Sequence, residues 1–317
     1  MTPALIPERR PTPPHQVLAS GLEFPEGPVA RADGSVVLTE VGRGVVSQVM
    51  ADGTVRVLAT CGGGPAGLAV GPDGAYYACN GGGTRFRDLD GMLQPWGASE
   101  SYVAGRIERI DPETGGVRVL YTECDGRALS SPNDIVFDGD GGFWFTDLGK
   151  TRGRTRDFGA VYYARADGTS IRQAIFPLDT PNGIGLSPDG RTLYVAETIT
   201  ARLWAFEITG PGTVRAADSR WRKGRLMIGL PGLAAFDSLA VQADGAVCVA
   251  TLLDGGITRV SADGTRAEHI PFSDTYVTNI CFGGPGLRTA FVTLSSKRQL
   301  VAVEWDAAGL NPHFSDL

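Results

Sequence analysis

The chain has 317 residues, including 44 glycines and 20 prolines, and its formal net charge is −6. Glycine is present at roughly twice its usual share, which fits poorly with a helix bundle because each interior glycine costs about 1 kcal/mol relative to alanine. The absence of a Gly-X-Y period excludes collagen. The densest basic stretch is Arg152, Arg154 and Arg156, which is typical of a solvated loop, so no nucleic-acid partner is expected.

The N-terminal sequence and the cysteines indicate the cellular compartment of the protein. We expect residues 1–20 to form a proline-containing N-terminal arm, which lacks the apolar stretch of a signal peptide. No apolar run reaches the roughly 18 residues of a membrane span, so no membrane association is expected. The five cysteines are odd in number and include no Cys-x-x-Cys pair, which indicates a reducing compartment and a cytoplasmic protein.

Asp-Gly pairs are the main local signal along the chain. Most of them stand between two short apolar or β-branched runs, a pattern typical of β-hairpins with type I′ turns, in which both central residues have positive φ. Helical periodicity is nearly absent, so the sequence predicts an all-β protein. The twelve pairs begin at Asp33, Asp52, Asp73, Asp90, Asp125, Asp138, Asp140, Asp167, Asp189, Asp244, Asp254 and Asp263.

The hairpins recur in six units whose starts are 39, 67, 49, 55 and 42 residues apart. Six units of about 40 residues, each with three or four strands, predict a six-bladed β-propeller over residues 21–310, followed by a C-terminal tail at 311–317. A two-sheet sandwich is the alternative, but it does not explain six similar units. The units begin at Gly27, Ala66, Asn133, Asn182, Asp237 and Asn279.

Two insertions lengthen the units. The first, at about residues 80–105, has little strand pattern and would be either a functional lid or a disordered loop; its aromatic residues favour the lid. The second covers residues 148–159. Asp147, at the end of the preceding strand, is a candidate substrate contact, with the capping of a loop as the alternative. The other candidate substrate contacts are Asn80, Arg85, Trp96 and Tyr102.

In a propeller the first strand of each blade lines the central channel, so polar residues at the six strand starts are expected to converge. They include two carboxylates and two carboxamides, and desolvated like charges are costly unless a cation neutralises them. Hard oxygen donors suit Ca²⁺, Mg²⁺ or Mn²⁺. The alternative is that these are ordinary turn residues, but four matching positions favour a cation site. The four are Glu26, Asn133, Asn182 and Asp237.

Several motifs make the chain resemble a known family. FPEGPV at Phe24, SPNDIVFD at Ser131, TPNGIGLSPDGRTLYVAET at Thr180 and DSLAV at Asp237 are similar to the senescence marker protein, gluconolactonase and regucalcin family, which includes luciferin-regenerating enzymes. The likeness covers about residues 22–306. It implies a six-bladed propeller that hydrolyses lactones with one divalent metal ion in the channel, with calcium first and zinc, magnesium or manganese as alternatives.

The resemblance also implies residue roles. Glu26, Asn182 and Asp237 would be metal ligands, Asn133 a further ligand or a substrate contact, and Asp237 also the general base. Many relatives have Pro-Asp-Gly where this chain has Phe236-Asp237-Ser238, so a different local turn with the same carboxylate is expected here.

The number and spacing of the histidines agree with hydrolysis that depends on a metal ion. The three histidines have neither ligand spacing nor a Gly-x-Ser-x-Gly partner, which disfavours a serine triad and a histidine-bound zinc site. The expected function is therefore a metal-dependent lactonase of carbohydrate metabolism, acting on an aldono- or glucono-type lactone, as a monomer or weak homo-oligomer. A propeller hydrolase for apolar lactones or organophosphates and a non-catalytic calcium- or protein-binding propeller are the alternatives.

Overall fold

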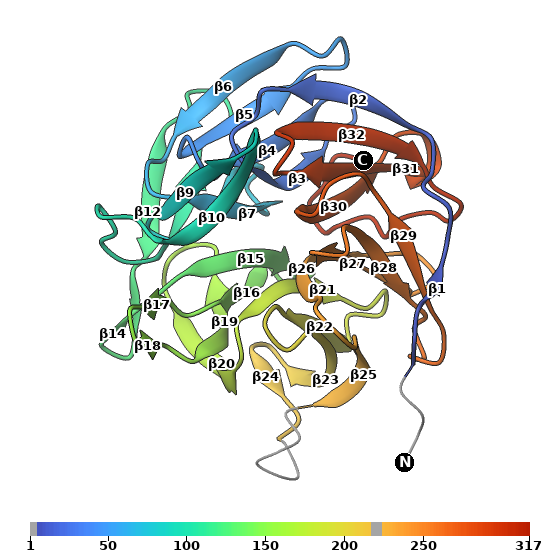
Figure 1. Cartoon of the computed structure of the whole chain (residues 1–317). Coiled ribbons are helices and arrows are strands. Elements are labelled where there is room, and N and C mark those ends of the chain that lie inside the picture. Colours follow the sequence, from blue (N-terminus) through green and yellow to red (C-terminus); the bar gives the residue numbers. More distant parts are fainter. Residues whose placement is uncertain (1–4, 217–223) are drawn as a thin grey trace.

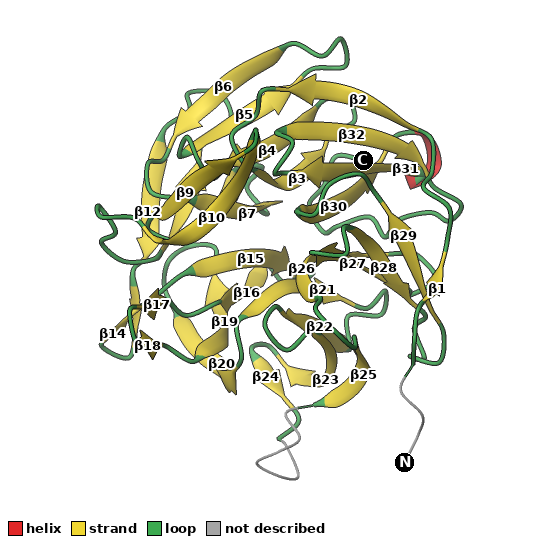
Figure 2. Ribbon diagram, viewed as in Figure 1, coloured by secondary structure: helices red, strands yellow, loops and turns green. Residues whose placement is uncertain are grey.

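Six β-sheets surround one axis in the computed structural model, which describes residues 5–216 and 224–317 (Figures 1 and 2). The innermost strand of each sheet contacts the innermost strands of both neighbours, which closes the ring. In the described residues the only helix is a short 3-10 turn, η1 (Pro285–Leu287), and no helix there is long and apolar enough to cross a membrane. The prediction of an all-β, six-bladed β-propeller is confirmed.

The first three blades follow one another along the chain, and each is an antiparallel sheet. From the axis outward they are β3 (Pro25–Ala30), β4 (Val36–Glu40), β5 (Val45–Val49) and β6 (Val55–Thr60); β7 (Pro65–Val70), β8 (Tyr76–Asn80), β11 (Arg106–Ile110) and β12 (Val117–Tyr121); and β15 (Pro132–Phe137), β16 (Gly142–Asp147), β19 (Gly159–Arg165) and β20 (Ile171–Leu178).

The last three blades complete the ring. From the axis outward they are β21 (Pro181–Leu186), β22 (Thr192–Glu197), β23 (Arg202–Gly210) and β25 (Arg225–Gly229), with β24 (Thr213–Val214) on β23; β26 (Ala235–Val241), β27 (Val247–Leu252), β28 (Gly256–Val260) and β29 (Ala267–Pro271); and β30 (Val277–Gly283), β31 (Thr289–Leu294), β32 (Gln299–Glu304) and an N-terminal strand.

The N-terminal segment closes the last blade. β2 (His15–Ser20) pairs antiparallel with β32, and β1 (Glu8–Arg9) pairs parallel with β29. Residues 15–20 therefore belong to the propeller rather than to a separate arm, because they supply the backbone partners that the outer edge of β32 would otherwise lack. The two ends of the chain are thus joined by hydrogen bonds in one sheet.

The two insertions form short hairpins. β9 (Thr84–Leu89) pairs with β10 (Met92–Ala98), so the first insertion contains strands that its sequence pattern did not indicate. Their pairing depends on the contact of the hairpin with the blades rather than on alternation of apolar residues. The second insertion holds β17 (Thr151–Arg152) and β18 (Thr155–Arg156), and a further hairpin joins β13 (Glu123–Cys124) to β14 (Arg127–Ala128).

Most Asp-Gly pairs adopt a different turn from the one predicted. Both residues have positive φ only at Asp90-Gly91 and Asp125-Gly126. At eight of the other ten pairs a glycine in the left-handed region donates to the carbonyl three residues earlier, as a type I turn before such a glycine does: Gly34 (φ 82°) donates to the Arg31 carbonyl at 3.0 Å. The aspartate stabilises this turn, because Asp33 Oδ1 accepts the Ser35 N–H at 2.9 Å. The hairpin prediction was right and the turn type was wrong.

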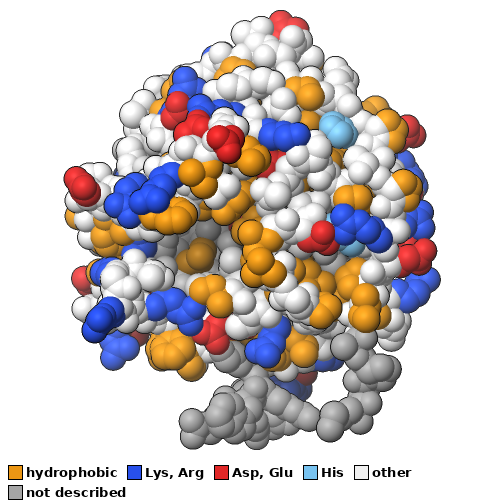
Figure 3. Space-filling view, in the orientation of Figure 1, with side chains coloured by type: hydrophobic (Ala, Val, Ile, Leu, Met, Phe, Trp, Pro, Cys, Tyr) orange, Lys and Arg blue, Asp and Glu red, His pale blue; other side chains and the backbone are white. Residues whose placement is uncertain are grey.

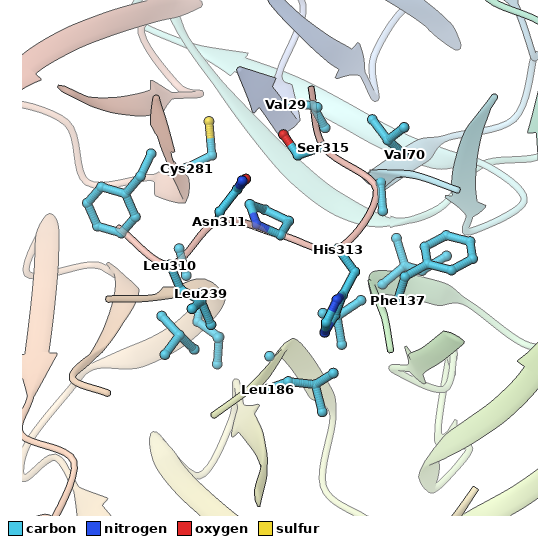
Figure 4. Close-up of a pocket in the computed structure, with 18 of the residues that line it drawn as sticks. Val29, Val70, Phe137, Leu186, Leu239, Cys281, Leu310, Asn311, His313 and Ser315 are labelled. Atoms are coloured by element: carbon cyan, nitrogen blue, oxygen red, sulfur yellow. The ribbon is translucent and has the colours of Figure 1, made fainter. Parts of the chain in front are cut away.

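The C-terminal tail covers one end of the channel. It borders a cavity of about 290 Å³, whose other walls are mostly apolar residues of the innermost strands, together with the polar side chains of Asp134 and Asn279. Figure 4 shows Val70, Phe137 and Leu186 around the same space as Leu310, which directly precedes the tail, and His313 of the tail. Residues 311–317 therefore pack over this mouth of the channel, although most of them remain exposed.

Candidate active site

A β-bulge interrupts the innermost strand of every blade near its start. The pairing with the second strand shifts register between Glu26 and Val29 in β3, between Phe236 and Leu239 in β26, and at the matching place in the other four blades. A bulge adds one residue that has no ladder partner and re-aims the side chains beside it. The bulges therefore explain why residues at the strand starts can face the axis.

The four predicted metal ligands line one cavity. This cavity of about 290 Å³ opens at the end of the channel opposite the C-terminal tail, and its walls include Glu26, Asn133, Asn182 and Asp237. Figure 3 shows a hollow on this face, beside the hairpin of β9 and β10, with apolar side chains around it. The structure thus brings together residues that are up to 211 positions apart in the sequence (237 − 26).

Close packing around the axis leaves little room beside these residues. A Cβ on Gly27 would lie 2.3 Å from the Ala66 carbonyl oxygen, and one on Gly183 would lie 2.7 Å from the Asp237 carbonyl oxygen. Gly27 also has positive φ (48°). Glycine after Glu26 and Asn182 is therefore needed for the neighbouring strands to approach.

The two carboxylates are buried in one cavity, and neither forms a salt bridge with a cation among the described residues. Glu26 is 5% exposed and Asp237 is 8% exposed. Burial raises the pKa of Glu26 to about 8, although hydrogen bonds from Asn279 Nδ2 (2.8 Å) and Gly27 N–H (2.7 Å) oppose this shift. Burial and the charge of Glu26 raise the pKa of Asp237 well above its usual range. The site therefore favours a positive ligand.

The donor set fits a hard divalent cation. Asn133 Oδ1 is buried and has no hydrogen-bond partner among the described residues, so an acceptor in this cavity has no protein donor. The described residues contain no cluster of three or more His, Cys, Asp or Glu side chains. Two carboxylates and two amide oxygens remain, and such all-oxygen sets suit calcium or magnesium better than softer metals.

Sequence reasoning missed Asp134, which lies directly below this ring. Its carboxylate accepts hydrogen bonds from the N–H groups of Ile135 (3.0 Å) and Ile184 (3.2 Å), and burial raises its pKa to about 7. Asp134 occupies the bulge position at which the first, second and fourth blades have glycine. A comparison of the six strand starts, position by position, could have revealed this exception. Its side chain ties the third blade to the fourth.

Asn80 and Asp147, predicted as substrate contacts, have other roles. Asn80 Oδ1 accepts the N–H groups of Gly64 (2.9 Å) and Gly82 (3.0 Å), and the side chain is fully buried. Asp147 accepts three backbone N–H groups, from Ser130, Ser131 and Gly149 at 2.7, 2.7 and 2.9 Å. Both side chains lie outside the lining of the cavity, because they hold the loops that enter and leave the inner strands.

Three other predicted contacts lie on the first insertion, outside the cavity lining. Arg85 donates to the Trp96 carbonyl at 3.2 Å, and the Trp96 ring, 44% exposed, lies under the Arg87 guanidinium. Tyr102 donates to the Ser130 carbonyl at 2.8 Å. These groups support the rim of the cavity. Neighbours of Trp96, namely Pro95 and Gly97, do line it.

Fold and site together define a class: a propeller whose inner strands surround a small cavity with buried oxygen donors. Residues 24–296 match the SMP-30/gluconolactonase/LRE-like family model. The chain belongs to this family, as its motifs predicted.

Three known proteins illustrate the relationship. The gluconolactonase of Zymomonas mobilis is 26% identical over 309 residues, covering 89% of this chain and 79% of that protein. The diisopropyl-fluorophosphatase of Loligo vulgaris is 27% identical over 231 residues, covering 67% and 70%. The crystal structure of a calcium-binding protein, regucalcin, from Agrobacterium tumefaciens superimposes with a TM-score of 0.69 at 18% identity, covering 98% and 99%. The last likeness shows the fold. The expectation of a lactonase-type enzyme agrees with the family.

Proposed function

We propose that this protein is a metal-dependent lactonase that opens a sugar lactone of the aldono or glucono type. The observation that carries the proposal is the ring of two buried carboxylates and two carboxamides in one small cavity. A purely structural or protein-binding propeller has no need of uncompensated carboxylates in its channel. The gluconolactonase from Zymomonas mobilis supports the choice of substrate class.

The proposed cofactor is one divalent ion, with calcium preferred because every donor is a hard oxygen. Glu26, Asn182 and Asp237 would hold it, with Asn133 as a fourth ligand or a substrate contact. The calcium-binding regucalcin with the same fold supports calcium, and magnesium, manganese and zinc are the alternatives. When bound, such an ion polarises a carbonyl oxygen and lowers the pKa of bound water.

Proton transfer, substrate orientation and exclusion of solvent would be carried out by side chains of the protein. Asp237 accepts the proton of the attacking water, a task that requires a carboxylate inside the cavity. Asn133, whose oxygen has no protein partner, orients the lactone or completes the ligand set. The rings of Phe24, Phe86 and Tyr276 pack together, with centroids 4.9 Å apart for Phe24–Phe86 and 6.1 Å for Phe24–Tyr276, and form an apolar wall against solvent.

A second candidate is a hydrolase for apolar lactones or organophosphates. The same aromatic wall favours it, because an apolar substrate would pack against these rings. The diisopropyl-fluorophosphatase of Loligo vulgaris gives it further support.

Location and metabolic role are part of the proposal. All five cysteines are free thiols, and this supports a reducing, cytoplasmic location. The proposed substrate class places the protein in carbohydrate metabolism, with a small-molecule lactone as its partner.

The proposal is tested by a panel of sugar lactones, alkyl lactones and a fluorophosphate, assayed with calcium and with a chelator. We expect calcium-dependent opening of a sugar lactone. Replacement of the base in Asp237→Asn should lower kcat by at least about 100-fold with the fold intact. Asp244→Asn, on an exposed turn of the same blade, is the matched control and should keep full activity. Turnover that survives both the chelator and Asp237→Asn would refute the proposal, and a preference for the fluorophosphate would support the second candidate.

A further inference from the structure

One cationic side chain lines the candidate active site. Lys150 follows β16 in the second insertion, and the side chain is buried, with the residue 7% exposed. It is the only Lys or Arg among the described residues that line this cavity. The same cavity holds the four oxygen donors of the ring, so a substrate at the ring lies within the space that Lys150 borders.

The ammonium of Lys150 has neutral partners. Its Nζ donates to the carbonyl oxygens of Gly81 (3.0 Å) and Gly83 (3.2 Å) and lies 4.8 Å from the centre of the Tyr102 ring. An ammonium has three N–H donors, so these two bonds leave one donor to serve a ligand. No carboxylate in the described part of the chain lies within ion-pair distance of Nζ. The carboxylate of Asp147 raises the pKa of Lys150 by its charge, but it accepts hydrogen bonds from three backbone N–H groups.

A buried positive charge without an anion is unfavourable. Burial lowers the pKa of Lys150 to about 8, so the side chain is still mostly protonated at neutral pH. The ring carboxylates do not act as its counter-ions, because neither of them forms an ion pair with it. A buried charge of this kind is neutralised when an anionic ligand enters.

We propose that Lys150 binds a carboxylate of the substrate, so that the preferred substrate is a lactone that carries a second, acidic group. This inference rests on the proposed lactonase function and narrows its substrate class. One compact ammonium with one remaining donor suits a monoanionic carboxylate, whereas phosphate recognition uses several donors or an arginine fork. The nearest arginine of the same loop, Arg152, is paired with Asp157 at 2.8 Å.

The size of the cavity agrees with this class. Its volume of about 290 Å³ is at the lower limit of ligand pockets, which range over about 300–1,000 Å³. A single sugar-acid ring with a short carboxylate arm suits this space better than a long acyl chain does.

The test uses two lactones that differ in one group. D-Glucono-1,4-lactone and D-glucaro-1,4-lactone have the same ring, but the first carries a hydroxymethyl group where the second carries a carboxylate. We expect wild-type protein with calcium to favour the glucaro-lactone by at least about 10-fold in kcat/KM. Lys150→Met should abolish this preference, a reduction of the ratio by at least about 10-fold, mainly through KM, because the lost contact is to a non-reacting group. Lys297→Met, on an exposed loop, is the matched control and should keep the wild-type ratio.

Each outcome decides one of the two proposals. Opening of the glucono-lactone without preference for the glucaro-lactone, or an unchanged ratio in folded Lys150→Met, would overturn the carboxylate inference and leave the lactonase proposal standing. Failure to open either lactone with any divalent ion would overturn the lactonase proposal itself. The wild-type ratio needs no variant, and Lys150→Arg, which keeps the charge, should retain part of the preference. These two measurements decide the question if Lys150→Met does not fold.

Discussion

Gly183→Ala tests whether close approach of the inner strands maintains the ring. The new Cβ would lie 2.7 Å from the Asp237 carbonyl oxygen and 2.8 Å from the Leu239 nitrogen. Both atoms are backbone, so β21 and β26 must separate, and overpacking of this kind costs about 1–3 kcal/mol. Unfolding entropy of about 2.1 cal/mol/K per residue gives roughly 0.67 kcal/mol/K for the whole chain, so Tm should fall by about 1.5–4.5 °C.

Calorimetry and calcium titration measure the two consequences. Because the clash displaces Asp237 directly, calcium affinity should fall together with Tm. Gly210→Ala is the matched control: Gly210 also lies in a strand without positive φ, and its new Cβ would meet nothing within 4 Å. Alanine should stabilise that position by about 0.4–1 kcal/mol. Equal Tm and equal calcium affinity in the two variants would refute the packing argument.

Three further predictions concern the metal ion, the tail and Lys150. Calcium at 100 times its Kd should stabilise the protein by about 2.7 kcal/mol, a rise in Tm of about 4 °C that a chelator reverses; no shift would contradict a metal site. Deletion of residues 311–317 should lower Tm in calorimetry, because it exposes the apolar cavity at that mouth; an unchanged Tm would contradict its packing role. The preference for the glucaro-lactone should fall as pH rises through about 8, where Lys150, whose pKa is lowered by burial and by Arg152 and raised by Asp147, and which lies against the Tyr102 ring, loses its proton; a flat ratio from pH 6.5 to 9 would contradict this.

Local sequence patterns predicted the blades and the ring because both repeat. Each hairpin is closed by residues a few positions apart, so the Asp-Gly pair and the flanking apolar runs are enough to predict it. The starts of the inner strands are equivalent by this repeat, so Glu26, Asn133, Asn182 and Asp237 could be placed around one axis from their positions alone. The turn type was not predicted correctly from the Asp-Gly pairs, because Asp33 stabilises a type I turn through its own side chain.

Residues whose partners lie in other blades were not predictable in this way. Asp134 bonds to Ile184, 50 residues away, and Lys150 bonds to the Gly81 carbonyl, 69 residues away. Neither partner is marked by periodicity or spacing. The roles of Asp134 and Lys150 follow from the packing of one blade against the next, and this packing is visible only in the folded structure.

Asp147 shows how a repeated role can resemble a site. Glu40 Oε2 accepts the Glu23 N–H at 2.8 Å, and Glu197 Oε1 accepts the Asp179 N–H at 2.8 Å. Each of these acids ends the second strand of its blade and holds the loop that leads into the first strand, as Asp147 does. Comparison of the second-strand ends would have identified this structural role from the sequence.

The separation of the ring from the insertions has a consequence for specificity. The ring belongs to bulged inner strands whose backbones are fixed by both neighbouring blades, so its geometry is set by the whole fold. Lys150 belongs to the second insertion and is bonded to Gly81 and Gly83 at the start of the first, while Arg152 bonds to Tyr102, so the two insertions act as one unit on one side of the mouth. A change in this unit can alter the group that is recognised without moving the oxygen donors. On the two proposals above, reaction type and substrate choice would therefore be governed by different segments of the chain, and only the segment that governs reaction type is anchored in the blades.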